Sequence, residues 1–333
     1  MPGPLPGIVK RVHAVNCIDG ASEIVDADVV RQMLSAGMRA LTGAANDRDA
    51  WTRFITPADV VGIKVNCSGA PHVMSTPEVV SGIVANLLAV GVPAASIYVY
   101  ERFQDQMKSV RYEDHLPAGT HVTAAEASYG SILGYDPYTY VEVNFFGEDD
   151  TRSCLTRLVS DRFTKIINVP NMKEHQASGV TGCLKNIAYG NFSNVARSHR
   201  FEKTNTYSFI GALASVEPLR SRTVLHIMDG LRGVWHGGPF SENARFRFFP
   251  KQLLFGTDPV AIDRVLIDVI EEKRRAEHAP SIFDRAPERI RREGELDPNF
   301  NAFLREPGHV EYAAKLGLGV YDRAAIQLET IEL

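Results

Sequence analysis

The sequence predicts an α/β fold in which a mostly parallel sheet is flanked by helices. Two observations support this class: short apolar runs alternate with helical segments, and those segments carry recognisable helix starts and stops. Strands joined through a helix run parallel, because such crossovers are right-handed and return to the same sheet. A less regular middle stretch predicts an insertion or a smaller α+β subdomain.

We divide the chain into three parts on this pattern. Residues 1–102 form a first α/β half, and residues 103–160 form an irregular insertion or edge hairpin. Residues 161–333 form a second α/β half that carries a cationic motif and a C-terminal helix.

The first half has the order strand, helix, strand, helix, strand. The helices are predicted at 26–43, which opens on an acidic cap and ends at Gly43, and at 76–91, which opens with Thr76 and Pro77. The strands are the apolar runs "PGIVKRVHAV", "ADVVGIKVN" and "ASIYVYER".

The insertion is rich in Tyr, Gly, Asp and Pro, and its alternating "YTYVEVNFF" predicts a hairpin or edge strand. The periodic pattern then resumes. Strands are predicted at "FTKIINVP", "RTVLHIMDG" and "KQLLFGTD", and helices at "GVTGCLKNIAYG", "PVAIDRVLIDVIEEKRR" and "GHVEYAAKLGLGVYD". The charged segment 275–307 is expected to form a surface excursion.

Composition describes a soluble protein without a general affinity for polyanions. The 333 residues carry 36 Lys and Arg against 40 Asp and Glu, a net charge of −4, so no global positive field attracts nucleic acid. No apolar run is long enough to span a bilayer, and the first residues lack the regions of a leader. We expect a cytoplasmic protein with no nucleic-acid or membrane partner, and homo-oligomerisation stays open.

The four cysteines are scattered along the chain and form no CxxC pair. This spacing argues against a structural zinc site and against an iron–sulfur cluster held by cysteine alone. A cofactor is therefore not identified by the sequence, although a divalent metal held by other residues remains an alternative.

Polar side chains follow five of the predicted strands. Loops at the carboxyl ends of parallel strands converge on one edge of the sheet, where ligands bind. The side chains concerned are Lys64, Asn66, Ser68, Glu101, Arg102, Asn171, Lys173, His175, Asp229, Arg232, Thr257 and Asp258.

The most unusual stretch is "NVPNMKEHQASGVTGCLKNIAYGNFSNVARSHR" at 168–200. Between Thr164 and Lys203 the chain has six Lys or Arg against two acids, in a protein that is acidic overall. The glycines around Thr181 open a helix whose free N–H groups favour an anion. We therefore predict a small anionic partner, carrying a carboxylate or phosphate.

The leading hypothesis is an enzyme that acts on this anion by Lys/His acid–base chemistry. Lys173, His175 and Lys185 are the predicted catalytic residues, because a lysine buried among cations has a lowered pKa. The predicted substrate-binding residues surround them: Lys64, Asn66, Gly179, Thr181, Gly182, Asn186, Arg197, His199 and Asp229.

Two alternatives stay open. A divalent metal in the same cleft would be held by some of His175, His199, Asp229 and Asp258, although the local lysines oppose a cation. A non-catalytic anion or cofactor binding protein would use the same cleft without a group of shifted pKa.

Six segments resemble, in this order, the domain of unknown function 362 family: "DVVGIKVNCSG", "STPEVVSGIVANLL", "IINVPNMKEHQASGVTGCLKN", "LHIMDGLRG", "GTDPVAIDRV" and "AAKLGLGVYD". The resemblance covers nearly the whole chain and implies no activity. Many relatives carry a ferredoxin-like module, which this sequence lacks. Relatives of this long form often bear a twin-arginine leader, so the resemblance implies a periplasmic or exported protein if such a leader precedes this chain.

Overall fold

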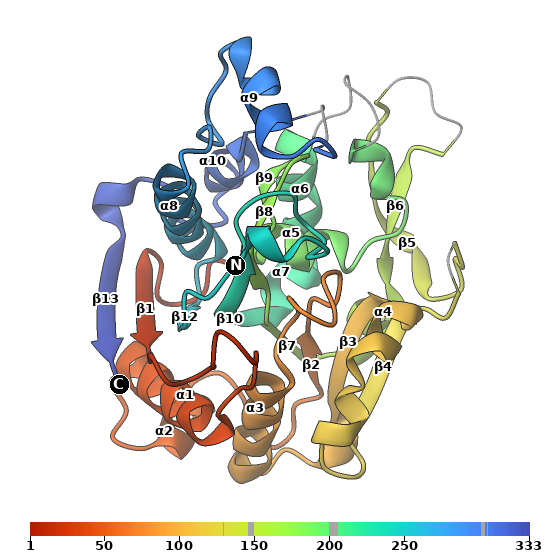
Figure 1. Ribbon diagram of the computed structural model, residues 1–333. Coiled ribbons are helices and arrows are strands. Elements are labelled where there is room, and N and C mark those ends of the chain that lie inside the picture. The colour runs from red at the N-terminus through yellow and green to blue at the C-terminus, as the bar shows by residue number, and fades with distance from the viewer. Residues whose placement is uncertain (129, 146–149, 200–205, 301–303, 305) are drawn as a thin grey trace.

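The computed structural model describes residues 1–128, 130–145, 150–199, 206–300, 304 and 306–333. Most strands join one large sheet, and a separate pair forms a small hairpin (Figure 1). The strands are β1 Ile8–His13, β2 Val61–Lys64, β3 Ile97–Phe103, β4 His121–Glu126, β5 Tyr135–Glu142, β6 Arg152–Thr156, β7 Lys165–Asn168, β8 Asn171–His175, β9 Gly179–Val180, β10 Thr223–Val234, β11 Arg247–Phe248, β12 Gln252–Gly256 and β13 Gln327–Glu332.

The large sheet has the order β13-β1-β12-β10-β7-β2-β3-β4. Its strands are mostly parallel, and β12 runs antiparallel to both of its neighbours. The parallel α/β class expected from the sequence is therefore confirmed. Strand β1 from the start of the chain lies between β12 and β13 from its end, so both ends build one side of the sheet.

Helices cover both faces of the sheet (Figure 1). Those described are α1 Ala27–Thr42, α2 Asp47–Thr52, α3 Pro77–Val90, α4 Gln104–Val110, α5 Gly182–Tyr189, α6 Thr206–Ala214, α7 Leu219–Arg222, α8 Pro259–Ala276, α9 Glu288–Leu296 and α10 Gly308–Lys315. Helices α1 and α3 pack together on one face, while α5 packs against α6 and α8 on the other.

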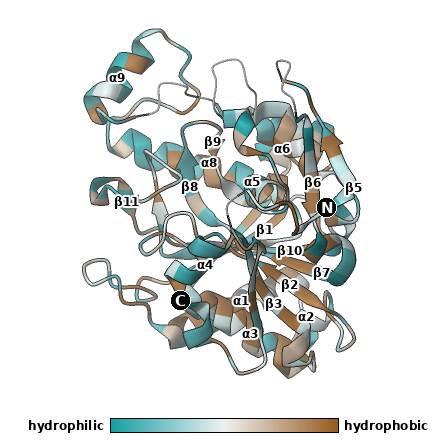
Figure 2. Cartoon of the chain, turned by 90° about the vertical axis from the view of Figure 1, so that its right-hand side faces the viewer, coloured by the Kyte–Doolittle hydropathy of each residue, from teal (hydrophilic) through white to brown (hydrophobic). Residues whose placement is uncertain are grey.

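The central strands are rich in apolar residues, and strands β2 and β3 are largely brown in Figure 2. Neighbouring residues of one strand enter different core clusters: Ile166 of β7 packs with the α5 and α8 side, and Ile167 with the α1 and α3 side. Side chains of a strand point alternately to its two faces, so a sheet covered on both faces needs such continuous apolar runs.

The helix boundaries follow local capping. Asp26 accepts hydrogen bonds from the backbone of Asp28 and Val29 at the start of α1, and Gly43 ends that helix in the left-handed conformation. Gly91 ends α3 in the same way. These starts and stops agree with the boundaries expected from the sequence.

Several elements differ from the expectation. The loop expected around Lys173 and His175 is a strand, β8, which pairs with β10 and β9. Strand β13 was not expected either, and it pairs in parallel with β1. Within the part of the chain that the structure describes, no helix has both the length and the apolar character that a membrane crossing needs.

Candidate functional site

A cavity of about 310 Å³ lies where the sequence places the site, and we call it the Lys185 cavity. It brings together six of the predicted residues, from β8, α5, the turn before α5 and the segments that follow β2 and α5. These are Asn66, His175, Thr181, Lys185, Asn186 and His199. Residues that are distant in sequence thus meet at the edge of the sheet beyond β2 and β3, as expected for an open α/β sheet.

Lys185 is the main cation of this cavity. Lys185 is buried, with 7% of the residue exposed. Its Nζ lies 4.7 Å from the ring centroid of Tyr189, which is one helical turn further along α5. Among the described residues, no acceptor forms a hydrogen bond or ion pair with this Nζ. Burial, with a contribution from the Lys173 ammonium, lowers the pKa of Lys185 to about 7.

Lys173 lies behind the cavity wall. Its side chain is fully buried, and its Nζ donates hydrogen bonds to Asn66 Oδ1 at 2.8 Å and to Ser68 Oγ at 3.4 Å. Burial lowers the pKa of Lys173 to about 7. Asn66 also donates from Nδ2 to Asn186 Oδ1 at 3.1 Å, so Lys173 fixes an amide pair that faces the cavity.

Lys64 does not face the cavity. Its buried Nζ donates to Glu101 Oε2 at 2.9 Å and to the carbonyl oxygen of Val65. The charge of Lys64 is therefore balanced inside the protein by Glu101, which does line the cavity. The geometry does not favour the predicted role of Lys64 as a ligand of the substrate anion, because its Nζ donates to two internal partners and Lys64 does not line the cavity.

His175 and His199 stand beside Lys185. The two rings are stacked, with centroids 5.2 Å apart and planes inclined by 14°. Burial, followed by the Lys185 ammonium, holds the pKa of His175 well below its usual range, so this ring is neutral. Its Nδ1 accepts the backbone N–H of Ala177 at 3.1 Å, which places the proton on Nε2.

The start of α5 is occupied by a carboxyl group of the protein itself, that of Asp263, and burial raises the pKa of this group to about 7. The carboxylate of Asp263 from α8 accepts the backbone N–H groups of Cys183 and Leu184, the latter at 2.9 Å. Gly182 has a φ of 59°, and a Cβ there would lie 2.2 Å from Asp263 Oδ1. The geometry does not favour the predicted binding of a substrate anion at this helix start, because Asp263 already accepts these two N–H groups.

Gly179 also serves packing rather than binding. Its φ is 75°, and a Cβ on it would lie 2.4 Å from the backbone nitrogen of Pro307. Thr181, between these two glycines, does line the Lys185 cavity. Only Thr181 of the glycine-rich turn is therefore placed to touch a ligand.

Three further candidate residues, Asp229, Asp258 and Arg197, form hydrogen bonds with backbone groups of the protein itself. Asp229 accepts the backbone N–H groups of Thr76 and Leu231 and does not line the Lys185 cavity. Asp258 caps α8 through its bond from Ala261, which is the role that an N-terminal Asp commonly has.

Arg197 is the third of these candidates. Its guanidinium donates to the backbone oxygens of Asn194, Val143 and Thr151, and it lies over the rings of Phe145 and Phe209. It thus fastens the segment after α5 to the hairpin, and it does not line the Lys185 cavity.

The metal alternative is not supported by the geometry. Among the described residues, no three His, Cys, Asp or Glu side chains are arranged to hold a metal ion. Two of the four proposed ligands, Asp229 and Asp258, are engaged with backbone N–H groups outside the cavity.

Three other members of the cationic segment, Arg200, Glu202 and Lys203, lie outside the described residues.

Some residues of the site were missed. Tyr189 lines the cavity, and it could have been found because it lies four residues after Lys185 on one helix face. His309 of α10 is buried, and burial followed by the charge of Lys185 lowers its pKa to about 3. No sequence spacing connects His309 to the cationic motif.

Comparisons with known proteins identify a family and no activity. The family described as a domain of unknown function (DUF362) matches residues 61–268. A crystal structure of a protein from Thermotoga maritima shares 10% sequence identity, and the alignment covers 92% of this chain and 88% of that chain with a TM-score of 0.46. No curated protein matches this sequence.

Proposed function

The chain belongs to the domain of unknown function 362 family, whose description names no activity, and we propose that it is an enzyme that performs acid–base chemistry on a small anionic substrate. The substrate carries a carboxylate or phosphate group that binds in the Lys185 cavity.

The observation that carries the proposal is the state of Lys185. A buried ammonium group is costly unless an anion or several acceptors compensate it. Lys185 has only the ring of Tyr189 as a partner among the described residues, and it lines a cavity of about 310 Å³. An anionic group of the substrate would supply the missing charge and the hydrogen-bond acceptors.

Lys185 is also suited to moving a proton. Its pKa is about 7 in the free protein, so it gains a proton when the anion binds, and as an ammonium group it can donate a proton to the substrate. Lys173 contributes by raising the local positive charge and by holding Asn66 in place. In this proposal Lys173 is a positioning residue, because it does not line the cavity.

His175 would act as a neutral hydrogen-bond donor. Its Nδ1 is occupied by the N–H of Ala177, so Nε2 carries the proton and can donate to a substrate oxygen. Negative charge that develops on this oxygen during proton transfer would be stabilised by the donor. Thr181 and Asn186 add polar atoms at the cavity wall.

Proton transfer to or from carbon leaves an isotopic record. We would incubate the protein in D₂O with a panel of small carboxylates and phosphate esters and follow loss of carbon-bound hydrogen by proton NMR. Exchange or turnover that is abolished in both Lys185→Met and His175→Gln supports the proposal. Lys108→Met is the matched control, because Lys108 is an exposed lysine on α4.

The second candidate is a non-catalytic anion carrier, which the same Lys185 cavity favours. Binding of a panel compound without exchange or turnover under these conditions would support the carrier. Unchanged activity in both the Lys185 and the His175 variants would contradict the acid–base proposal.

A further inference from the structure

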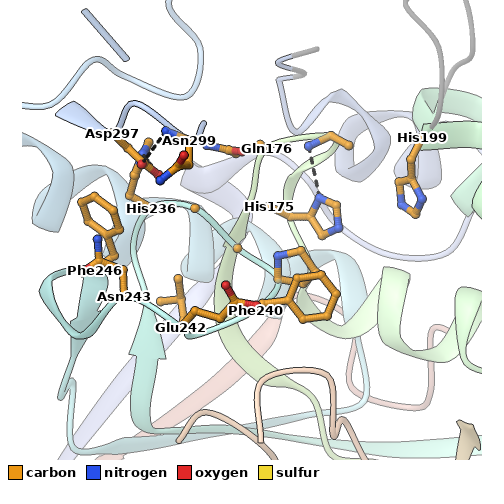
Figure 3. A pocket seen from close by; sticks show the side chains of 15 residues that line it. His175, Gln176, His199, His236, Phe240, Glu242, Asn243, Phe246, Asp297 and Asn299 are labelled. Carbon is orange, nitrogen blue, oxygen red and sulfur yellow. Dashed lines mark hydrogen bonds and ion pairs between the residues drawn. The ribbon is translucent and has the colours of Figure 1, made fainter. Parts of the chain in front are cut away.

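A second cavity, of about 520 Å³, adjoins the Lys185 cavity, and we call it the Glu242 cavity. The two share four lining residues, His175, His199, Pro239 and Phe240, so they meet at these side chains. Figure 3 shows the Glu242 cavity with His175 and Phe240 at its boundary. A ligand longer than a simple anion could extend from one cavity into the other.

The two cavities have opposite charge. Lys185 lines the first without an ion-pair partner among the described residues, while Arg102 is paired with Glu126 and Glu101 with the buried Lys64. The second is lined by two carboxylates, Glu242 and Asp297, and its lining among the described residues contains no Lys or Arg. Charges of opposite sign at the two ends favour a ligand with a negative group at one end and a positive group at the other.

The acidic end is not neutralised from within. Glu242 forms no ion pair with a described residue, and its carboxylate is directed into the cavity in Figure 3. The buried His236 lies next to Asp297, with Nε2 3.5 Å from Asp297 Oδ2 and without a hydrogen-bond partner among the described residues. Burial lowers the pKa of His236 to about 4, so its ring is neutral and supplies no positive charge to Asp297, whose Oδ1 accepts the backbone N–H of Asn299 at 3.0 Å.

The junction between the two ends supplies apolar surface and one polar group. Pro239 and Phe240 form the apolar part. The ring of His175, which is 6% exposed, faces both cavities, and its Nε2 proton has no acceptor among the described residues. A built site of this kind accepts a short carbon skeleton between two charged groups.

We infer that the two cavities together bind a dipolar substrate, with its carboxylate or phosphate at Lys185 and an ammonium group at Glu242 and Asp297. This inference rests on the proposed function and narrows its substrate class to aminated small anions. A carboxylate oxygen of Glu242 or Asp297 accepts hydrogen bonds from the substrate ammonium, and the apolar junction contacts the carbon skeleton.

The test compares ligands that differ in one charged group. Titration calorimetry would measure the affinity of the full chain for 4-aminobutyrate, 6-aminohexanoate and 8-aminooctanoate, and for butyrate, hexanoate and octanoate. The variants are Glu242→Gln, Asp297→Asn and Lys185→Met, with Glu113→Gln as an exposed acidic control.

We expect the amino acid of one chain length to bind about tenfold or more tightly than its parent carboxylate. Glu242→Gln and Asp297→Asn should reduce this advantage and leave binding of the parent carboxylate unchanged, whereas Lys185→Met should weaken both. If the amino group gives no advantage at any length while carboxylates still bind through Lys185, the dipolar inference is wrong and the proposed function stands. If Lys185→Met changes neither ligand, the anion site of the proposed function fails as well.

Discussion

Lys64 and Glu101 form an ion pair of 2.9 Å in the wall of the Lys185 cavity, with 0% and 8% of their side chains exposed. The pair joins β2 to the neighbouring β3. Glu101 directly follows Tyr100, the residue of β3 that pairs with Lys64 of β2. Two charges in such a place are tolerable only together, because the loss of one leaves the other buried without compensation. The pair therefore stabilises the wall of the cavity and does not act as a substrate ligand.

Removal of one partner should be far more costly than removal of both. We expect Lys64→Met to lower the free energy of unfolding by about 3–5 kcal/mol, and the double variant Lys64→Met/Glu101→Gln to regain much of this loss. Urea unfolding of the four proteins in the cycle measures both values. A double variant no more stable than Lys64→Met would show that the two side chains act independently.

The sequence predicts most of the fold, because its signals are local. Asp26 and Gly43 mark the two ends of α1 by their side chain and backbone preference, and the apolar runs mark the central strands. Strand β8 was missed because "NMKEH" carries polar residues that usually indicate a loop. It is a strand because pairing with β10 and β9 satisfies its backbone and buries its side chains, which is a tertiary effect.

The composition of the site was predicted better than its roles. Lys185 and His175 lie in one cavity as expected, since both are close in sequence to the start of α5. The partners that assign roles are distant in sequence: Asp263 occupies the helix start and Glu101 neutralises Lys64. A single sequence does not show which distant residues pair. It therefore could not show that the acceptor at the helix start is Asp263 rather than a substrate anion.

Lys185 should destabilise the free protein at neutral pH. Its folded pKa of about 7 lies below the unfolded value of 10.5, so the unfolded state binds more protons between these two values. Stability from this group is therefore present at high pH and is lost as the pH falls through 10.5 toward 7. Each unit of pKa difference corresponds to about 1.4 kcal/mol.

The variant Lys185→Met removes the buried charge and keeps most of the length of the side chain. The pKa difference corresponds to about 5 kcal/mol, and loss of the contact with Tyr189 offsets up to about 2 kcal/mol of this. We therefore expect the variant to gain about 3 kcal/mol of unfolding free energy near pH 6 and much less at pH 10. Urea unfolding at the two pH values measures the difference, and Lys108→Met should change little at either. A variant less stable than the parent protein at pH 6 would contradict this electrostatic account.

Anion binding should take up a proton. An anion beside Lys185 stabilises its charged form and raises its pKa above 7, so binding at pH 8 converts neutral lysine to ammonium. Affinity for sulfate, which does not titrate in this range, should fall by about tenfold per pH unit above pH 7. Calorimetry at pH 8 in buffers of different ionisation enthalpy measures the proton uptake, and an affinity that is constant from pH 6 to pH 9 would argue against Lys185 as the ligand.

The contact of Asp263 with the start of α5 yields the last prediction. Asp263→Ala leaves the N–H groups of Cys183 and Leu184 without acceptors in a buried place and should cost about 2–4 kcal/mol. The substitution also leaves a space of the size of a carboxylate next to a helix start, which favours small anions. Formate should therefore restore part of the lost stability in thermal unfolding.

Asp26→Ala is the matched control: it removes an exposed cap of α1, should cost about 1 kcal/mol, and leaves no enclosed space for formate. Equal effects of formate on both variants would mean that the rescue is a general salt effect, and the assignment of Asp263 as the internal acceptor at the start of α5 would fail.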